Sequence, residues 1–297
     1  MHIAKAELPN YAGSAKQIAF IVGTGRCGTT ILAKVLNSHS KICVPHELQF
    51  LIILYDKYSL SELKNYRADD FIRLINECCP YYFENFFDYI QHFKNLQYPQ
   101  TDLRKVLTDL FDHVCFKYKK EIFMEQTPWY GQKLDILKEI FPEMKVIHMI
   151  RDGRDVAVSF SRTPWWSKNI DENIERWGQE IHTIHNFGIK NMAKYLAVRY
   201  EDLVLNTTYE LNKILNFLNV PFESEMLSLD NLIDYFSLFK GGETSQYQSS
   251  EFNRWIGNKD KIFFRENTYA WKKNDKLKSL NLTKEVKDTL NLFNYEI

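Results

Sequence analysis

Short apolar runs alternate with amphipathic stretches along the chain. An apolar run at 18–22 leads into a turn with three glycines, after which apolar residues recur at helical spacing (Ile31, Leu32, Val35 and Leu36). Further runs of strand length lie at 41–44, 121–125, 145–150 and 196–199. Strands that alternate with helices predict an α/β fold of three layers, in which a central parallel sheet is flanked by helices.

The segments between these strands also carry recognisable patterns. Apolar residues mark helices at 134–141 and from the corner after Ile150 through Ser159, and another helix is led by Leu211 after capping-box spacing from Thr207 to Glu210. Residues 48–120 are rich in aromatic side chains and mostly helical in pattern, which predicts a helical insertion that lines the acceptor cleft. The polar stretches 163–176 and 241–270 are expected to form exposed or irregular loops.

Composition limits the classes of protein to which the chain can belong. The 297 residues are 45% hydrophobic and 15% aromatic, which predicts one well-packed domain over 1–297. Lys plus Arg equals Asp plus Glu at 38 each, so the chain lacks the basic field that holds nucleic acid. No apolar run is long enough to cross a membrane, and the N-terminus lacks the blocks of a signal peptide. The five cysteines show no metal spacing, predict no metal site, and suit a reducing, cytoplasmic location.

The glycine turn after the first strand has the chemistry of an anion site. Glycine lets the backbone approach a ligand closely, and the first turn of a helix leaves N–H groups without partners. The guanidinium of Arg26 suits oxyanions, and two threonines add hydroxyl donors. The predicted binding residues are Gly25, Arg26, Cys27, Gly28, Thr29 and Thr30. The alternative is an ordinary strand-to-helix turn that keeps its glycines for geometry.

The spacing of this turn narrows the kind of anion. Gly23 and Gly28 match the G-x-x-x-x-G of a nucleoside triphosphate loop, but Thr29 stands where that motif has its lysine. The loop therefore lacks the cation that reaches the outer phosphates of ATP. Cys27 lies where a helix N-terminus and an arginine would make a thiol reactive, although a small residue that fills a tight loop is the simpler interpretation.

A second anion site is predicted at the end of the run 145–150. Arg151 ends that strand, and Ser159 lies eight positions later, about two turns into the next helix. An arginine and a serine that reach one ligand suit a phosphate monoester. The alternative is that Arg151 pairs with Asp152 or Asp155 on the surface.

Together these motifs resemble those of sulfotransferases that use 3′-phosphoadenosine-5′-phosphosulfate (PAPS). Residues 23–30 resemble the 5′-phosphosulfate loop of that family, and 151–159 resemble its 3′-phosphate motif, with arginine and serine at the family spacing. The segment 198–203 resembles the one whose tyrosine, here Tyr200, lies near the adenine. Trp271 and Lys272 resemble more weakly the C-terminal segment that covers the nucleotide. The resemblance implies a P-loop-like domain that uses PAPS as co-substrate and no metal.

Within this family the loop arginine and Glu47 resemble the tyrosylprotein and bacterial carbohydrate branch. There the glutamate is the general base, so the resemblance assigns catalysis to Glu47 and Arg26, with His46 as the competing base. The chain departs from the family pattern at Gln126, where a lysine is usual. Either Arg26 acts alone, another cation such as Lys272 replaces that lysine, or activity is reduced.

The resemblance implies transfer of a sulfuryl group to an acceptor hydroxyl of a carbohydrate, a tyrosyl side chain or a small metabolite. Two alternatives remain open. A P-loop kinase of small molecules would need the missing lysine, and a non-catalytic nucleotide-binding relative is suggested only by Gln126.

Overall fold

The structure, a computed structural model, describes most of the chain outside two long stretches. The described residues are 13–45, 47–48, 52, 103–164, 166–228, 230, 262–263, 265–278 and 280–297. They include all five predicted strands and both predicted anion-binding segments. The larger part of the predicted helical insertion, and most of the predicted irregular stretch 241–270, lie outside them.

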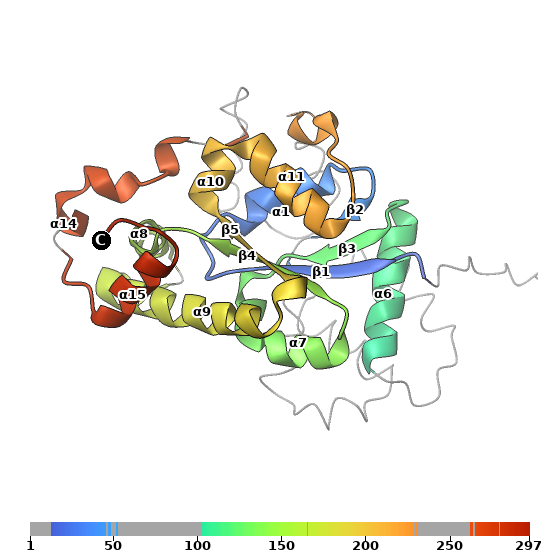
Figure 1. The fold of residues 1–297 in the computed structure, drawn as a ribbon, viewed down its shortest axis with the longest axis horizontal. Coiled ribbons are helices and arrows are strands. Elements are labelled where there is room, and N and C mark those ends of the chain that lie inside the picture. The colour runs from blue at the N-terminus through green and yellow to red at the C-terminus, as the bar shows by residue number, and fades with distance from the viewer. Residues whose placement is uncertain are drawn as a thin grey trace, which may run out of the picture.

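Five parallel strands form one sheet, in the order β2-β3-β1-β4-β5 (Figure 1). The strands are β1 (Gln17–Val22), β2 (Ile42–Cys43), β3 (Ile122–Glu125), β4 (Lys145–Ile150) and β5 (Tyr195–Arg199). In register, Phe20 of β1 lies opposite Glu125 of β3 and Val146 of β4. The segments that follow these three strands therefore meet at one edge of the sheet. The predicted α/β class is confirmed.

Helices cover both faces of the sheet (Figure 1). The flanking helices are α1 (Thr29–Asn37), α6 (Leu103–Lys117), α7 (Leu134–Ile140), α8 (Gly153–Ser161), α9 (Ile170–Lys190), α10 (Tyr200–Leu205) and α11 (Thr207–Leu218). Side chains of β1 alternate between two cores: Ala19 and Ile21 pack with α1, α10 and α11, and Phe20 and Val22 pack with α6 and α7. Apolar side chains on both faces explain why the strands read as continuous apolar runs.

Helix α6 is the part of the predicted helical insertion that the structure describes. Its buried face packs on the sheet, where the Phe111 ring stacks on Phe123 of β3 at 3.9 Å between ring centres. Asp112 accepts hydrogen bonds from the backbone N–H groups of Gly13 and Ala15, which precede β1. This helix therefore belongs to the core of the domain.

Helix α9 corrects the expected exposed loop over 163–176, because the chain is helical from Ile170 onward. Asn169 caps the helix by accepting from the backbone N–H groups of Asp171 and Glu172. A buried stripe follows at 3.6-residue spacing, formed by Ile174, Trp177, Ile181 and Ile184. The first turn of the helix is polar, so the sequence up to 176 shows little of this apolar stripe.

The predicted capping box at the start of α11 is also wrong. The Thr207 hydroxyl donates to the carbonyl of Leu203 and makes no cap bond to Glu210 in the structure as described.

The remaining described elements are short or C-terminal. They are the 3₁₀ helices η1 (Pro128–Lys133), η2 (Met192–Lys194), η3 (Ser224–Leu227), η4 (Arg265–Asn267) and η5 (Ala270–Lys273), and the helices α14 (Asp275–Lys278) and α15 (Lys284–Leu292). Val286 and Leu290 of α15 pack with Trp177 of α9. Among the helices described, none is long and apolar enough to cross a bilayer.

Replacing Gly153 by alanine is expected to destabilise the fold. The added Cβ would lie 2.5 Å from ring carbons of Trp177, which is buried and cannot move without disturbing α9. Overpacking of this kind costs about 1–3 kcal/mol, measurable as a lower free energy of unfolding in urea.

Gly178→Ala is the matched control, since its Cβ would find its nearest neighbour at 3.4 Å and alanine favours a helix interior. Stability that is unchanged or higher is expected for this variant. Equal losses in both variants would contradict the packing argument.

Candidate active site at the carboxyl edge of the sheet

The glycine loop between β1 and α1 has the backbone of an anion cradle. Gly25, Arg26 and Gly28 have φ of 77°, 54° and 95°, all in the left-handed region. Gly28 precedes α1, and a Cβ there would lie 2.5 Å from the Tyr200 ring. With no acidic residue in its first turn, α1 directs its first backbone N–H groups and its positive dipole end at the space before it.

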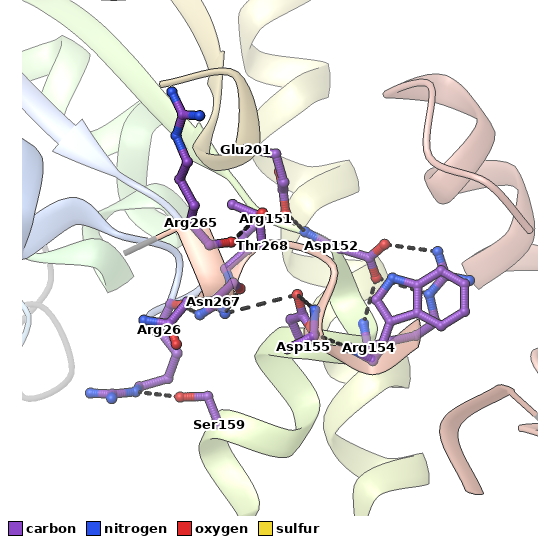
Figure 2. Close-up of polar contacts among 12 residues, drawn as sticks. Arg26, Arg151, Asp152, Arg154, Asp155, Ser159, Glu201, Arg265, Asn267 and Thr268 are labelled. Atoms are coloured by element: carbon purple, nitrogen blue, oxygen red, sulfur yellow. Dashed lines mark hydrogen bonds and ion pairs between the residues drawn. The ribbon is translucent and has the colours of Figure 1, made fainter. Parts of the chain in front are cut away.

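The two predicted anion-binding segments contact each other (Figure 2). Nε of Arg26, in the loop, donates to Oγ of Ser159 on α8 at 3.0 Å. Nη1 of Arg151, at the end of β4, donates to the carbonyl oxygen of Arg26 at 3.1 Å. Arg26, Arg151 and Ser159 therefore face one site.

Arg151 is held mainly by backbone oxygens and an aromatic ring. Its Nη2 donates to the carbonyl of Asn267 at 2.8 Å, and its guanidinium lies 4.8 Å from the centre of the Tyr200 ring. The nearest carboxylate in an ion pair with it, Asp155, is 3.9 Å away. Asp152 pairs with Arg154 instead, at 2.7 Å. The charge of Arg151 is thus weakly compensated, which suits a phosphate ligand.

A buried polar network supports this corner of β4. Asp152 accepts from both Nε and Nη2 of Arg154, while the backbone N–H of Asp152 donates to Glu201 at 3.0 Å. The second oxygen of Glu201 accepts from the Tyr295 hydroxyl at 2.8 Å. Burial raises the pKa of Glu201. This network fixes the backbone of the corner, and no local sequence pattern marks Glu201 and Tyr295, because they lie far from it along the chain.

Of the other predicted nucleotide contacts, Tyr200 touches the glycine loop, whereas Trp271 and Lys272 contact residues outside it. Tyr200 is nearly buried beneath Gly28. Trp271 donates its backbone N–H to Asp155 at 2.8 Å, and its ring lies 3.5 Å from the Arg154 guanidinium. Lys272 forms an ion pair with Glu296 in the C-terminal segment. Roles of these residues in binding nucleotide remain predictions.

Glu47, the predicted base, follows β2 in the chain and lies close enough to Glu125, the last residue of β3, for its charge to act on that carboxyl. Its neighbour Leu48 is fixed twice: its N–H donates to Glu125 at 2.7 Å, and its carbonyl accepts from the Tyr130 hydroxyl. The negative charge of Glu47 helps to raise the pKa of Glu125, although burial is the main cause. His46, the competing base, lies outside the described residues. Glu125 is thus a supporting residue that sequence patterns did not single out.

The structure also describes the surroundings of Gln126, in the turn after β3, and of Cys27, in the glycine loop. Gln126 is 1% exposed, and its Oε1 finds no hydrogen-bond donor among the described residues. Cys27 is fully buried, and burial raises the pKa of its thiol to about 11. Both the burial and the raised pKa disfavour a reactive thiolate at Cys27, in favour of a small residue that fills a tight loop. Among the described residues, no cluster of His, Cys, Asp or Glu could hold a metal ion.

Comparison with known proteins adds sequence and structural relatives. A model of the sulfotransferase family matches residues 19–224. Protein-tyrosine sulfotransferase 1 of Danio rerio is 24% identical over 234 residues, which span 73% of this chain and 57% of that protein. A putative protein-tyrosine sulfotransferase of Caenorhabditis elegans is 31% identical over 112 residues, covering 36% of this chain and 43% of its own. The chain thus spans about half the length of these curated relatives.

Two solved structures share the fold over nearly the whole chain. The sulfotransferase domain from the curacin biosynthetic pathway aligns with a TM-score of 0.62 at 21% identity, covering 95% of this chain and 98% of that domain. The sulfotransferase domain of the Synechococcus PCC 7002 olefin synthase gives 0.61 at 22% identity and covers 95% of each chain.

The Glu125 carboxyl is expected to make stability depend on pH. Burial raises its pKa from 4.5 to about 7, so the folded protein keeps a proton that the unfolded chain releases in this interval. Its contribution therefore lowers the free energy of unfolding as pH rises from about 4.5 to about 7, by roughly 3 kcal/mol in total. Urea unfolding of Glu125→Gln at pH 5 and pH 8 should lack this decrease.

Glu139→Gln removes an exposed carboxylate from α7 and is the matched control, which should keep the wild-type dependence on pH. The buried His148, whose pKa is lowered to about 3, has the opposite effect between about pH 3 and 6.5, and Glu180, whose pKa burial raises to about 7, acts in the same direction as Glu125. Both are common to every variant, so the test is the difference in pH dependence between the Glu125→Gln variant and the wild type. A Glu125→Gln protein with the wild-type slope would show that this carboxyl is ionised in the fold.

Proposed function

The chain belongs to the sulfotransferase family of enzymes, and we propose that it transfers a sulfuryl group from PAPS to an acceptor hydroxyl. One observation carries this proposal: the glycine loop and the corner at Arg151 contact each other directly. A nucleotide with phosphate groups at both its 5′ and 3′ positions needs two anion sites that face one cleft. This arrangement supports such a ligand better than a nucleoside with a single chain of phosphates.

The binding mode follows from the donors available at each segment. The loop amides, the two threonine hydroxyls and the Arg26 guanidinium would hold the 5′-phosphosulfate. Arg151 and Ser159 would hold the 3′-phosphate, since both contact Arg26 in the structure and both carry donors. Tyr200, packed against Arg151 and Gly28, would border the adenine.

The proposed reaction is a single in-line displacement at sulfur. Glu47 accepts the proton of the acceptor hydroxyl, whose oxygen forms a bond to sulfur. The bond between sulfur and the bridging oxygen breaks, and adenosine 3′,5′-bisphosphate (PAP) leaves with that oxygen. Arg26 and the loop amides stabilise negative charge on the sulfuryl and 5′-phosphate oxygens, as in phosphoryl transfer, where positioning and electrostatics provide most of the catalysis.

The acceptor is proposed to be a hydroxyl on a tyrosyl side chain, a carbohydrate or a small metabolite. Relatives named for protein tyrosine sulfation support the first of these, and they match this chain over only part of their own length. Radiolabelled sulfate transfer from PAPS to a panel of the three classes tests the reaction. Thermal melting tests the nucleotide, because PAP should stabilise the protein more than ADP with Mg²⁺. The reverse order would favour a kinase, and binding of PAP with no transfer to any acceptor would favour a non-catalytic relative.

Arg151→Ala should weaken PAP binding selectively. Loss of a charged hydrogen-bond donor to phosphate costs about 1.5–3 kcal/mol, or roughly 10- to 100-fold in Kd. Calorimetric titration with adenosine 5′-phosphosulfate, which lacks the 3′-phosphate, provides the control and should give a nearly unchanged Kd. Equal weakening of both ligands would mean that Arg151 acts only by supporting the loop.

Arg26→Ala should cost at least about 2–4 kcal/mol of transition-state stabilisation, the range for loss of a preorganised oxyanion donor, and this loss is measured as a lower kcat/KM. The measurement uses the first acceptor that the panel identifies. Arg26→Lys keeps the charge and is the matched control, with a smaller loss expected. Unchanged kcat/KM in Arg26→Ala would remove this residue from the mechanism.

A further inference from the structure

Arg176 is a partly buried cation at the start of the glycine loop, and the mechanism above leaves it without a role. It lies in the second turn of α9, and its side chain is 22% exposed. Nη2 of Arg176 donates to the carbonyl oxygen of Thr24 at 3.3 Å. Thr24 is fully buried and follows the first glycine of the loop. A helix that sequence patterns missed therefore brings a positive charge to the loop.

Aromatic rings hold the guanidinium in place. Its central carbon lies 3.8 Å from the centre of the Trp166 ring and 4.5 Å from that of Phe160, which are cation–π contacts. Trp166 in turn stacks on Trp129 with ring centres 6.0 Å apart. The same rings border the loop, since a Cβ on Gly25 would lie 2.9 Å from the tip of Phe160. The cation is thus clamped against the loop and has little freedom to move away.

The hydrogen bonds of this guanidinium are incomplete. Nε lies 3.4 Å from an oxygen of Glu180, and no acceptor among the described residues bonds to the buried Nη1. The other oxygen of Glu180 is also buried without a donor in the same set of residues. Buried charged groups with unsatisfied hydrogen bonds are costly unless a ligand completes them. An anion at the loop is a ligand of the right charge for Arg176.

The start of the loop is linked through hydrogen bonds to the segment that carries the predicted base. Gly23 donates its N–H to the carbonyl of Pro128 at 3.1 Å, and the turn that contains Pro128 follows Glu125 directly. Glu125 holds Leu48, the neighbour of Glu47. In the proposed reaction the sulfuryl group passes to an acceptor that Glu47 activates, so the sulfuryl group is expected at the start of the loop. Gln126, which directly follows β3, is uncharged and supplies no cation to this part of the site.

We propose that Arg176 is a binding residue for the sulfuryl end of PAPS, where it supplies a positive charge in addition to that of Arg26. This inference rests on the proposed function, because it concerns the same loop and the same nucleotide. Arg176 would then supply the cation that is missing at Gln126, where the family usually has lysine. Lys272, the other candidate, is paired with Glu296. The cation comes from α9 and reaches the loop through the clamp formed by Trp166 and Phe160.

The test compares two nucleotides that carry similar charge in different places. Both nucleotides carry the 3′-phosphate and they differ at the 5′ end, where PAPS has negative charge on the sulfuryl group and the 5′-phosphate and PAP has it on the 5′-phosphate alone. By calorimetric titration, Arg176→Met, which keeps the apolar stem, should raise the Kd for PAPS about tenfold and change that for PAP less than about twofold. Arg176→Lys should recover most of the loss. Arg162→Met, which removes an exposed cation at the end of α8, should bind both as wild type does.

Equal weakening of both nucleotides, or a lysine variant as weak as the methionine variant, would overturn the inference in favour of a purely structural role. Melting curves show whether each variant is folded. Glu180→Gln provides a second measurement with the opposite sign, because it keeps the volume of the side chain and removes its negative charge. Burial raises the pKa of Glu180 to about 7, so the carboxylate of the wild type is largely ionised at pH 8. At pH 8 the substitution should tighten PAPS binding about two- to fivefold, and unchanged or weaker binding contradicts the inference.

The proposed function and this inference fail in different ways. Wild-type protein that binds neither PAP nor PAPS overturns both. Wild-type protein that binds both nucleotides, with Arg176→Met unchanged toward PAPS, overturns only the role of Arg176.

Discussion

The hydrogen bond between Arg26 and Ser159 joins two segments that lie 133 positions apart, and it depends on the order of strands in the sheet. Strand β1 is central, with β3 on one side and β4 on the other. Because all three are parallel, the glycine loop, the turn after Glu125 and the corner at Arg151 emerge at the same edge. If β4 were not a neighbour of β1, the two segments predicted to bind anions would be separated. The candidate site is thus a consequence of topology, to which local sequence adds the donors.

The loop keeps a backbone that most side chains disfavour. Arg26 has a φ of 54° although it carries a Cβ, and left-handed conformations of this kind cost energy that the surroundings must offset. Three contacts restrain it: its own bond to Ser159, the bond from Arg151 to its carbonyl, and the packing of Gly25 against Phe160. The strained residue is the one to which the resemblance assigns catalysis. A loop held from three sides keeps its amides oriented before a ligand arrives, which is the condition for electrostatic stabilisation.

Contiguous features were predictable from sequence, and features that depend on distant partners were not. The five strands are runs of neighbouring residues, so periodicity identified them, and the two segments predicted to bind anions are local motifs whose spacing could be read in the same way. The start of α9 was missed because its first turn is polar, and Arg176 was missed with it. The links from Glu125 to Leu48 and from Glu201 to Tyr295 join residues 77 and 94 positions apart. No local pattern marks such pairs, since only the folded sheet brings them together.

Two arginines three positions apart show how the fold separates structural charge from available charge. Arg154 lies against the Trp271 ring and donates twice to the Asp152 carboxylate, so its charge is neutralised inside the corner. Arg151 donates to two backbone carbonyls, and the carboxylate of Asp155 lies 3.9 Å away. Carbonyl oxygens orient a guanidinium but do not neutralise it. A chain with no net charge can therefore present positive potential at one edge of its sheet. The fold pairs some cations with carboxylates and holds others against neutral oxygens, where their charge stays available to an anion.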